Sequence, residues 1–165
     1  MTNTQVLKSE VIRATSWNEL KGLADFDPLE PGFLPAGTEI DYLAFTYFPF
    51  PGAALPTTRN GIFVAQYRVT GGYMRLEYGW GMGMPPEGIP DDVPHGQVNA
   101  GRYAATWVRG RGLGGVGPPT GGKPDEAYLR LAWRPDPNGA TGPGWKITTD
   151  SLALDEIVQV AESLR

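Results

Sequence analysis

The segment 62–80 places the strongest constraint on folding, because two stretches of alternating residues flank a glycine pair. Gly71-Gly72 is a signal for a two-residue hairpin turn, since such turns require positive φ angles. With Thr70 placed opposite Tyr73, every second residue falls on one apolar face. These residues are Phe63, Ala65, Tyr67, Val69, Met74, Leu76, Tyr78 and Trp80. The pattern predicts an antiparallel hairpin with one buried face, in which Gly72→Val is strongly destabilising.

Further strands are expected where β-branched and aromatic residues gather, at 40–48, 98–109, 128–134 and 145–149. The capping-box pattern Ser16-Trp17-Asn18-Glu19 predicts a short helix near the start of the chain. An apolar stripe with helical spacing predicts an amphipathic helix over 154–164. We therefore expect an N-terminal extension (1–15) and a single α+β domain (16–165). In that domain a twisted antiparallel sheet carries the short N-terminal helix and the packed C-terminal helix.

The composition agrees with a folded, loop-rich domain. The chain has 165 residues, of which 23 are Gly and 16 are Pro, a content that approaches that of low-complexity chains. It also has five Trp, seven Tyr and six Phe, whereas disordered chains are poor in aromatic residues. A β-rich globular domain is the better interpretation.

Several functions lack the residues they need. The net charge is −4, with no basic stretch for phosphates, so we expect no nucleic-acid partner. Cysteine is absent and His95 is the single histidine, which we interpret as a loop residue. We therefore expect no metal site, cofactor or nucleophilic triad. The longest uncharged run, 42–58, contains three prolines, so no membrane span is expected. The start of the chain lacks the apolar core of a signal peptide.

Candidate binding residues come from the aromatic and methionine side chains. Most are expected in the core, but a concave sheet can leave some of them in a groove. The groove candidates are Tyr67, Tyr78, Trp80, Met82, Met84, Tyr103 and Trp107. An alternative is a hydrolase that uses carboxylates such as Glu87, Asp91 or Asp92. The glycine-rich loops at 79–97 and 109–124 match neither a dinucleotide fingerprint nor a Walker pattern.

Three ordered segments resemble a known bacterial family. The first is Ser16-Trp17-Asn18-Glu19-Leu20 followed by the proline-rich stretch 28–37, the second is Asn99-Ala100-Gly101-Arg102-Tyr103-Ala104, and the third is Leu129-Arg130-Leu131-Ala132-Trp133. Members are extracytoplasmic, C-terminal domains of anchored anti-sigma factors and lipoproteins, without an assigned activity. One departure is Ala153, where the family often has a serine helix cap, so Asp150 or Ser151 is expected to cap the last helix.

The resemblance implies a non-enzymatic sensor or protein-interaction module outside the cytoplasm. It offers no catalytic residues to transfer to this chain. The first alternative is a carrier of a small hydrophobic ligand on a concave aromatic sheet face, and the second is the carboxylate-dependent hydrolase. The sequence leaves the partner, the ligand and the oligomeric state open.

Overall fold

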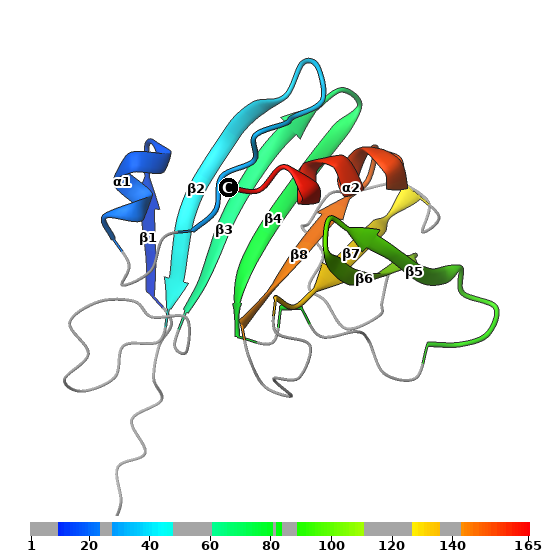
Figure 1. The fold of residues 1–165 in the computed structure, drawn as a ribbon. Helices are drawn as coiled ribbons and strands as arrows, with labels where there is room; N and C mark the ends of the chain where they lie inside the picture. The colour runs from blue at the N-terminus through cyan, green and yellow to red at the C-terminus, as the bar shows by residue number, and fades with distance from the viewer. Residues whose placement is uncertain are drawn as a thin grey trace, which may run out of the picture.

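Eight strands form one antiparallel sheet in a computed structural model (Figure 1). The structure describes residues 10–23, 28–47, 61–80, 82–83, 89–110, 127–135 and 143–165, with the backbone alone at Trp80. The elements are β1 (Glu10–Ala14), α1 (Trp17–Lys21), β2 (Glu39–Tyr47), β3 (Gly61–Val69), β4 (Gly72–Trp80), β5 (His95–Ala100), β6 (Tyr103–Arg109), β7 (Leu129–Trp133), β8 (Pro143–Thr149) and α2 (Leu154–Glu162). The expected sheet-dominated α+β class is confirmed.

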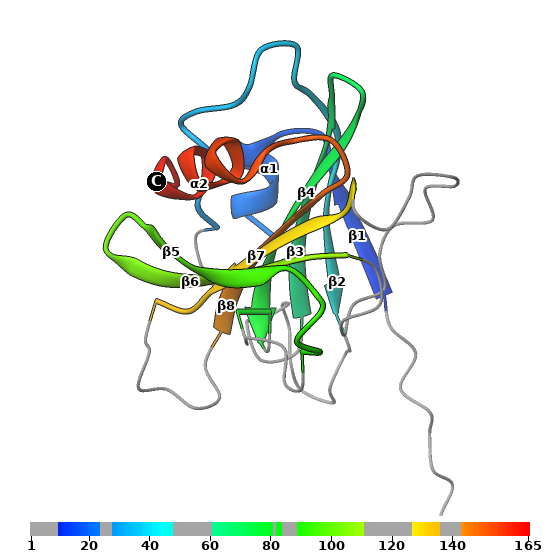
Figure 2. The same cartoon turned by 90° about the vertical axis from the view of Figure 1, so that its right-hand side faces the viewer.

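The strand order β1-β2-β3-β4-β8-β7-β6-β5 joins two meanders. The first meander runs from β1 to β4. The chain then crosses to the far edge and returns through β5, β6 and β7. The last strand, β8, lies between β7 and β4 and joins the two meanders into one sheet. Among the described strands, the terminal ones, β1 and β5, each pair on one side only. Figure 2 shows the sheet curving beneath α2, which gives it a concave and a convex face.

The β3–β4 hairpin forms, but its turn lies one residue earlier than the sequence predicted. Val69 pairs with Gly72, so the central turn residues are Thr70 and Gly71, and Gly71 has a φ of +83°. Each residue of β3 therefore pairs with a β4 residue two positions before the expected partner. Because side chains alternate with a period of two, a slip of two leaves each residue on its predicted face. Arg75 now lies opposite Gln66 rather than Arg68.

Three expectations about strands need correction. The single strand expected over 98–109 is a hairpin, in which Gly101, with a φ of +61°, turns the chain between β5 and β6. His95 is the first residue of β5 rather than a loop residue. Strand β1 falls inside the expected N-terminal extension, yet it pairs along its full length with β2.

The two helices differ in how their first turns are capped. In α1 the Ser16 hydroxyl accepts a hydrogen bond from the Glu19 N–H, as the capping box predicts. The Glu19 carboxylate accepts two hydrogen bonds from Thr15, one from its backbone N–H and one from its hydroxyl. Both bonds lower the pKa of Glu19, and the backbone bond has the larger effect. The cap expected for α2 is wrong. Ala153 occupies the cap position, and its N–H donates to the Glu156 carboxylate at 2.8 Å.

Asp150, instead of capping α2, ties β8 to β4. Its carboxylate accepts from the Tyr73 N–H at 2.9 Å, and the Thr149 hydroxyl donates to the Tyr73 carbonyl at 2.7 Å. The same hydroxyl accepts from the N–H groups of Ser151 and Leu152, which lead into α2. These bonds set the direction in which the chain leaves the sheet.

A short backbone pairing holds the end of α2 in place. The N–H of Glu30 donates to the Arg165 carbonyl at 3.0 Å, and the N–H of Arg165 donates back at 3.1 Å. Gly32 donates to the Ser163 carbonyl in the same ladder. The helix is thereby fixed at both ends, by Thr149 at its start and by 30–32 at its finish.

The main core lies between the concave face and the two helices. Trp17 of α1 packs on Phe63 with ring centroids 5.2 Å apart, and Ile157 and Val160 of α2 are fully buried. The sheet supplies the remainder of this cluster, which includes Leu43, Phe45, Ala65, Tyr67, Met74, Leu76, Leu129, Leu131 and Ile147. The predicted apolar faces of the hairpin, β7 and α2 therefore meet in one cluster.

The corrected turn moves the predicted effect of valine from Gly72 to Gly71. Gly71→Val should lower the free energy of unfolding by about 1–3 kcal/mol, because a β-branched residue is strained at positive φ. A Cβ at this position would meet only the Ser151 Cβ, at 4.0 Å, so crowding adds nothing. Gly71→Asn is the matched control, since asparagine tolerates this conformation. Urea unfolding that shows no loss in the valine variant would contradict the turn.

Candidate functional site

A pocket of about 310 Å³ lies between the end of α2 and the strands β5 to β8. Its volume is at the lower end of the range for small-molecule sites. The lining combines apolar side chains with two charged ones. The residues are Leu29, Ala100, Gly101, Arg102, Tyr103, Trp133, Pro135, Trp145, Ala161, Glu162 and Leu164. The pocket thus lies on the concave side of the sheet, beside the core.

Two tryptophans from neighbouring strands form the base of the pocket. Trp133 of β7 and Trp145 of β8 are paired residues, and their rings stack with centroids 6.3 Å apart and planes 14° apart. Tyr78 of β4 extends the row, with its ring 4.4 Å from that of Trp145. Both tryptophans are buried, so the base is part of the packed sheet. Flat aromatic surfaces of this kind bind apolar and ring-shaped groups.

The tip of the β5–β6 hairpin forms one rim. The Arg102 guanidinium lies 5.0 Å from the centroid of the Tyr103 ring and donates to the Tyr103 hydroxyl at 2.8 Å. The Gly101 N–H donates to the Glu162 carboxylate of α2 at 3.3 Å. The hairpin tip is therefore connected to the helix across the pocket. The mouth presents one cation and one carboxylate beside an apolar base.

The predicted groove residues are dispersed rather than gathered. Tyr103 lines the pocket, and Tyr78 is half-buried behind Trp145. Tyr67 is fully buried in the core, and burial raises the pKa of its hydroxyl. Trp107 packs over Gly96, where a Cβ would lie 2.9 Å from its indole nitrogen. Met82 follows β4 in a turn.

Two of the seven groove candidates remain. Met84 and the side chain of Trp80 lie outside the described residues. Tyr103 is the one described groove candidate that lines the pocket, and binding at these residues stays a prediction.

Sequence reasoning missed most of the pocket. The sequence predicts Trp145 only as part of the strand 145–149, and Trp133 mainly as a core residue of the strand 128–134. The signal that could have found the rim is Ala100-Gly101-Arg102, where a glycine interrupts a strand pattern. Ala161 and Glu162 were expected on the last helix, but only the packing of that helix shows which turn faces the pocket.

Candidate acid–base and metal-binding groups do not converge in the described chain. Asp91 and Asp92 are exposed at a turn before β5, and Glu87 lies outside the described residues. Nδ1 of His95 lies 2.7 Å from the Val93 carbonyl at an exposed position. Across the described ranges, no three acidic, histidine or cysteine side chains are grouped to hold a metal ion. None of the helices described there has the length and apolar character needed to cross a membrane.

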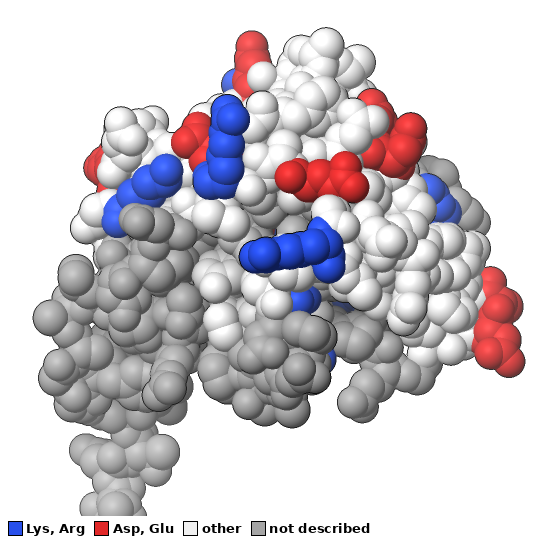
Figure 3. Space-filling view, in the orientation of Figure 1, with Lys and Arg blue, Asp and Glu red and all other residues white. Residues whose placement is uncertain are grey.

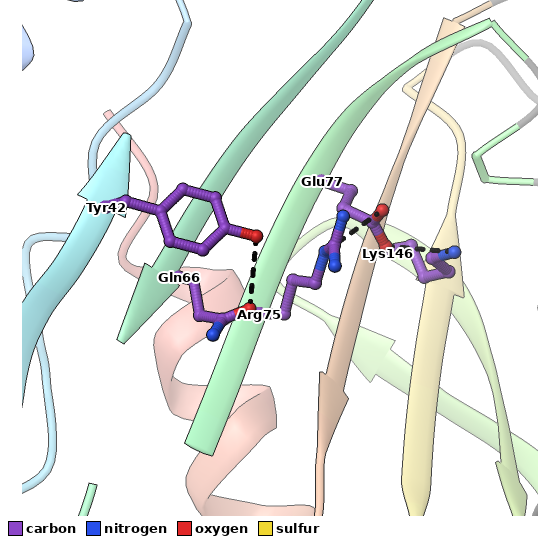
Figure 4. Close-up of polar contacts among 5 residues, drawn as sticks. All are labelled: Tyr42, Gln66, Arg75, Glu77 and Lys146. Carbon is purple, nitrogen blue, oxygen red and sulfur yellow. Dashed lines mark hydrogen bonds and ion pairs between the residues drawn. The ribbon is translucent and has the colours of Figure 1, made fainter. Parts of the chain in front are cut away.

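The convex face carries a partly buried ionic cluster that sequence analysis did not predict. Figure 4 shows Glu77 of β4 between Arg75 on its own strand and Lys146 on β8. The Glu77 carboxylate lies 2.9 Å from Lys146 Nζ and 3.3 Å from Arg75 Nε. On the other side of Arg75, Tyr42 donates to Gln66 at 3.3 Å. Polar contacts on this face thus join β2 to β3 and β4 to β8.

Charges on the outer surface are mixed. In the orientation of Figure 3, basic and acidic side chains are interspersed, and the described atoms of this face form no continuous basic patch. Arg68 and Glu39, which are both exposed, form an ion pair with atoms 3.2 Å apart. The expectation of no nucleic-acid partner stays a prediction, and this face adds no observation against it.

No family model, curated protein or solved structure matches this chain. The resemblance to the anti-sigma-factor and lipoprotein domain family therefore stays a prediction. The function has to be inferred from the pocket and the surfaces themselves.

The ionic cluster predicts a large effect for Glu77. Glu77→Gln should lower the free energy of unfolding by about 3 kcal/mol, because it leaves Arg75 and Lys146 without their shared carboxylate in a buried place. Glu39→Gln is the matched control. Its pair with Arg68 is largely exposed, so the loss should stay below about 1 kcal/mol. Chemical unfolding of both variants measures the difference, and equal losses would refute the buried role of Glu77.

Proposed function

We propose that this chain is a non-enzymatic sensor module that binds a small apolar ligand in the pocket beneath α2. The observation that supports it most is the stacked pair Trp133–Trp145 at the base of a cavity of about 310 Å³. A dry core would fill such a space with side chains, since protein interiors are close-packed. A role in an anchored regulator or lipoprotein outside the cytoplasm rests on the family resemblance alone.

The chemistry of the lining restricts the ligand. The pocket suits a compact molecule with one flat apolar portion rather than a long acyl chain, because its volume is small. The Arg102 and Glu162 side chains at the mouth favour a neutral or dipolar group at the exposed end of the ligand. Hydrolysis has little support, because Glu162 is the single carboxylate among the lining residues described above.

A protein partner is the second candidate, and the open sheet edges favour it. Strand β5 ends the sheet, and its residues His95, Gln97 and Asn99 are exposed. An extended segment of a partner can add to such an edge through backbone hydrogen bonds. Polar residues on an edge strand also limit non-specific pairing. This edge lies beside the pocket, so a bound ligand could alter it through the β5–β6 hairpin.

The pocket can be tested with a neutral aromatic probe and a filling variant. We expect N-phenyl-1-naphthylamine to bind the wild-type chain saturably, with a rise in its fluorescence. Ala161→Leu adds carbon atoms to the pocket lining and should weaken binding about tenfold or more, a change of about 1.4 kcal/mol.

Gln159→Leu is the matched control for this test. It introduces the same side chain on the exposed side of α2 and should leave the affinity within about twofold, well under 1 kcal/mol. Circular dichroism checks that both variants fold. An equal loss of affinity in both, or no saturable binding to the wild type, would contradict the proposal.

A further inference from the structure

Three buried donors on the convex face lack hydrogen-bond partners. They are the Tyr73 hydroxyl, Arg75 Nε and Arg130 Nη2, and none has a partner within the part of the chain that the structure describes. Arg75 Nε lies 3.3 Å from the Glu77 carboxylate, but this ion pair lacks hydrogen-bond geometry. Buried donors are nearly always paired in folded proteins, so a cluster of three unpaired ones needs an explanation.

The strand register brings these donors together. Arg75 of β4 and Arg130 of β7 both lie opposite Thr148 of β8, which stands between them. Because neighbouring strands are about 4.8 Å apart, the two arginine backbones are about 10 Å apart, within reach of their long side chains. Tyr73 lies two residues before Arg75 and therefore on the same face. Lys146 lies two residues before Thr148, beside them.

Among the described ion pairs of this cluster, two cationic side chains share one carboxylate. Glu77 serves both Arg75 and Lys146. The described ion pairs include none for Arg130, whose pKa is lowered by burial alone. Asp150 lies near Tyr73, where its carboxylate accepts from the Tyr73 backbone, and it raises the pKa of the Tyr73 hydroxyl after the larger effect of burial. An unpaired guanidinium at such a place is costly unless something neutralises it.

We propose that Tyr73, Arg75, Arg130 and Lys146 form a binding site for an oxyanion group, a carboxylate or a phosphate, on the convex face of the sheet. Guanidinium groups bind such groups with paired, charge-assisted hydrogen bonds. The Arg75 and Lys146 side chains are 23% and 14% exposed, so the cluster can be reached from solvent on that side. Trp133 and Trp145 point to the opposite face, so this site is separate from the pocket.

The test compares two arginine variants in thermal unfolding. Sodium phosphate, with ionic strength matched by sodium chloride, should raise the Tm of the wild type by about 3 °C or more. Arg130→Met should lose this extra shift, whereas Arg68→Met, which removes an exposed arginine on β3, should keep it. Phosphate also stabilises proteins generally, and that effect is common to both variants. Equal shifts in the two variants would overturn the proposal.

Further measurements keep the test decisive. Sodium acetate in place of phosphate shows which oxyanion the site prefers, and no selective response to either would refute the site. If Arg130→Met does not fold, the NMR signals of the Arg75 and Arg130 Nε–Hε groups in the wild type report binding directly. Chemical shifts that do not change on addition of phosphate or acetate would then refute the oxyanion site. The affinity for N-phenyl-1-naphthylamine should be unchanged in folded Arg130→Met, so failure of this site and failure of the pocket can be told apart.

Discussion

Burial of the concave face of one open, curved sheet is the constraint on which the structure depends. Eight strands present a continuous apolar surface there, and a single sheet cannot bury it alone. The helix α2 covers the centre through Ile157 and Val160, while α1 covers the β2–β3 side through Trp17 and Leu20. The backbone ladder between 30–32 and 163–165 keeps α2 in this position. The pocket lies above Trp133 and Trp145, between the last turn of α2 and the β5–β6 hairpin, which Gly101 joins to Glu162.

Different interactions dominate the two faces of the sheet. On the concave face, apolar burial dominates, and the aromatic row from Tyr78 to Trp133 leaves a preformed surface for an apolar group. On the convex face, β4 and β8 carry the partly buried charges of Arg75, Glu77 and Lys146 (Figure 4), and Arg130 lies on the neighbouring strand β7. Partly buried charges act strongly on one another and on any charged ligand. Alternation along β7 and β8 places these two environments on opposite sides of the same strands.

Local sequence patterns predicted the class of fold, the faces of its strands and both helices. They failed where more than one arrangement satisfies the same pattern. The β3–β4 turn moved by one residue because a register slip of two keeps every side chain on its face. The run 98–109 hid a hairpin because Gly101 alone marks the turn. Strand β1 is short and gains its order from pairing with β2. The pocket was missed because Trp133, Trp145 and Ala161 converge only in the folded sheet-and-helix arrangement.

The account depends most on whether the space above Trp133 and Trp145 receives a ligand. The most direct measurement is a ¹H–¹⁵N titration of the labelled chain with N-phenyl-1-naphthylamine, read at the indole N–H resonances of the five tryptophans. Saturable shifts are expected at Trp133 and Trp145 and at the Gly101 amide on the rim, with a smaller shift at Trp17, which does not line the pocket. Shifts confined to the edge strand β5, or no saturable shift at either base tryptophan, would contradict it.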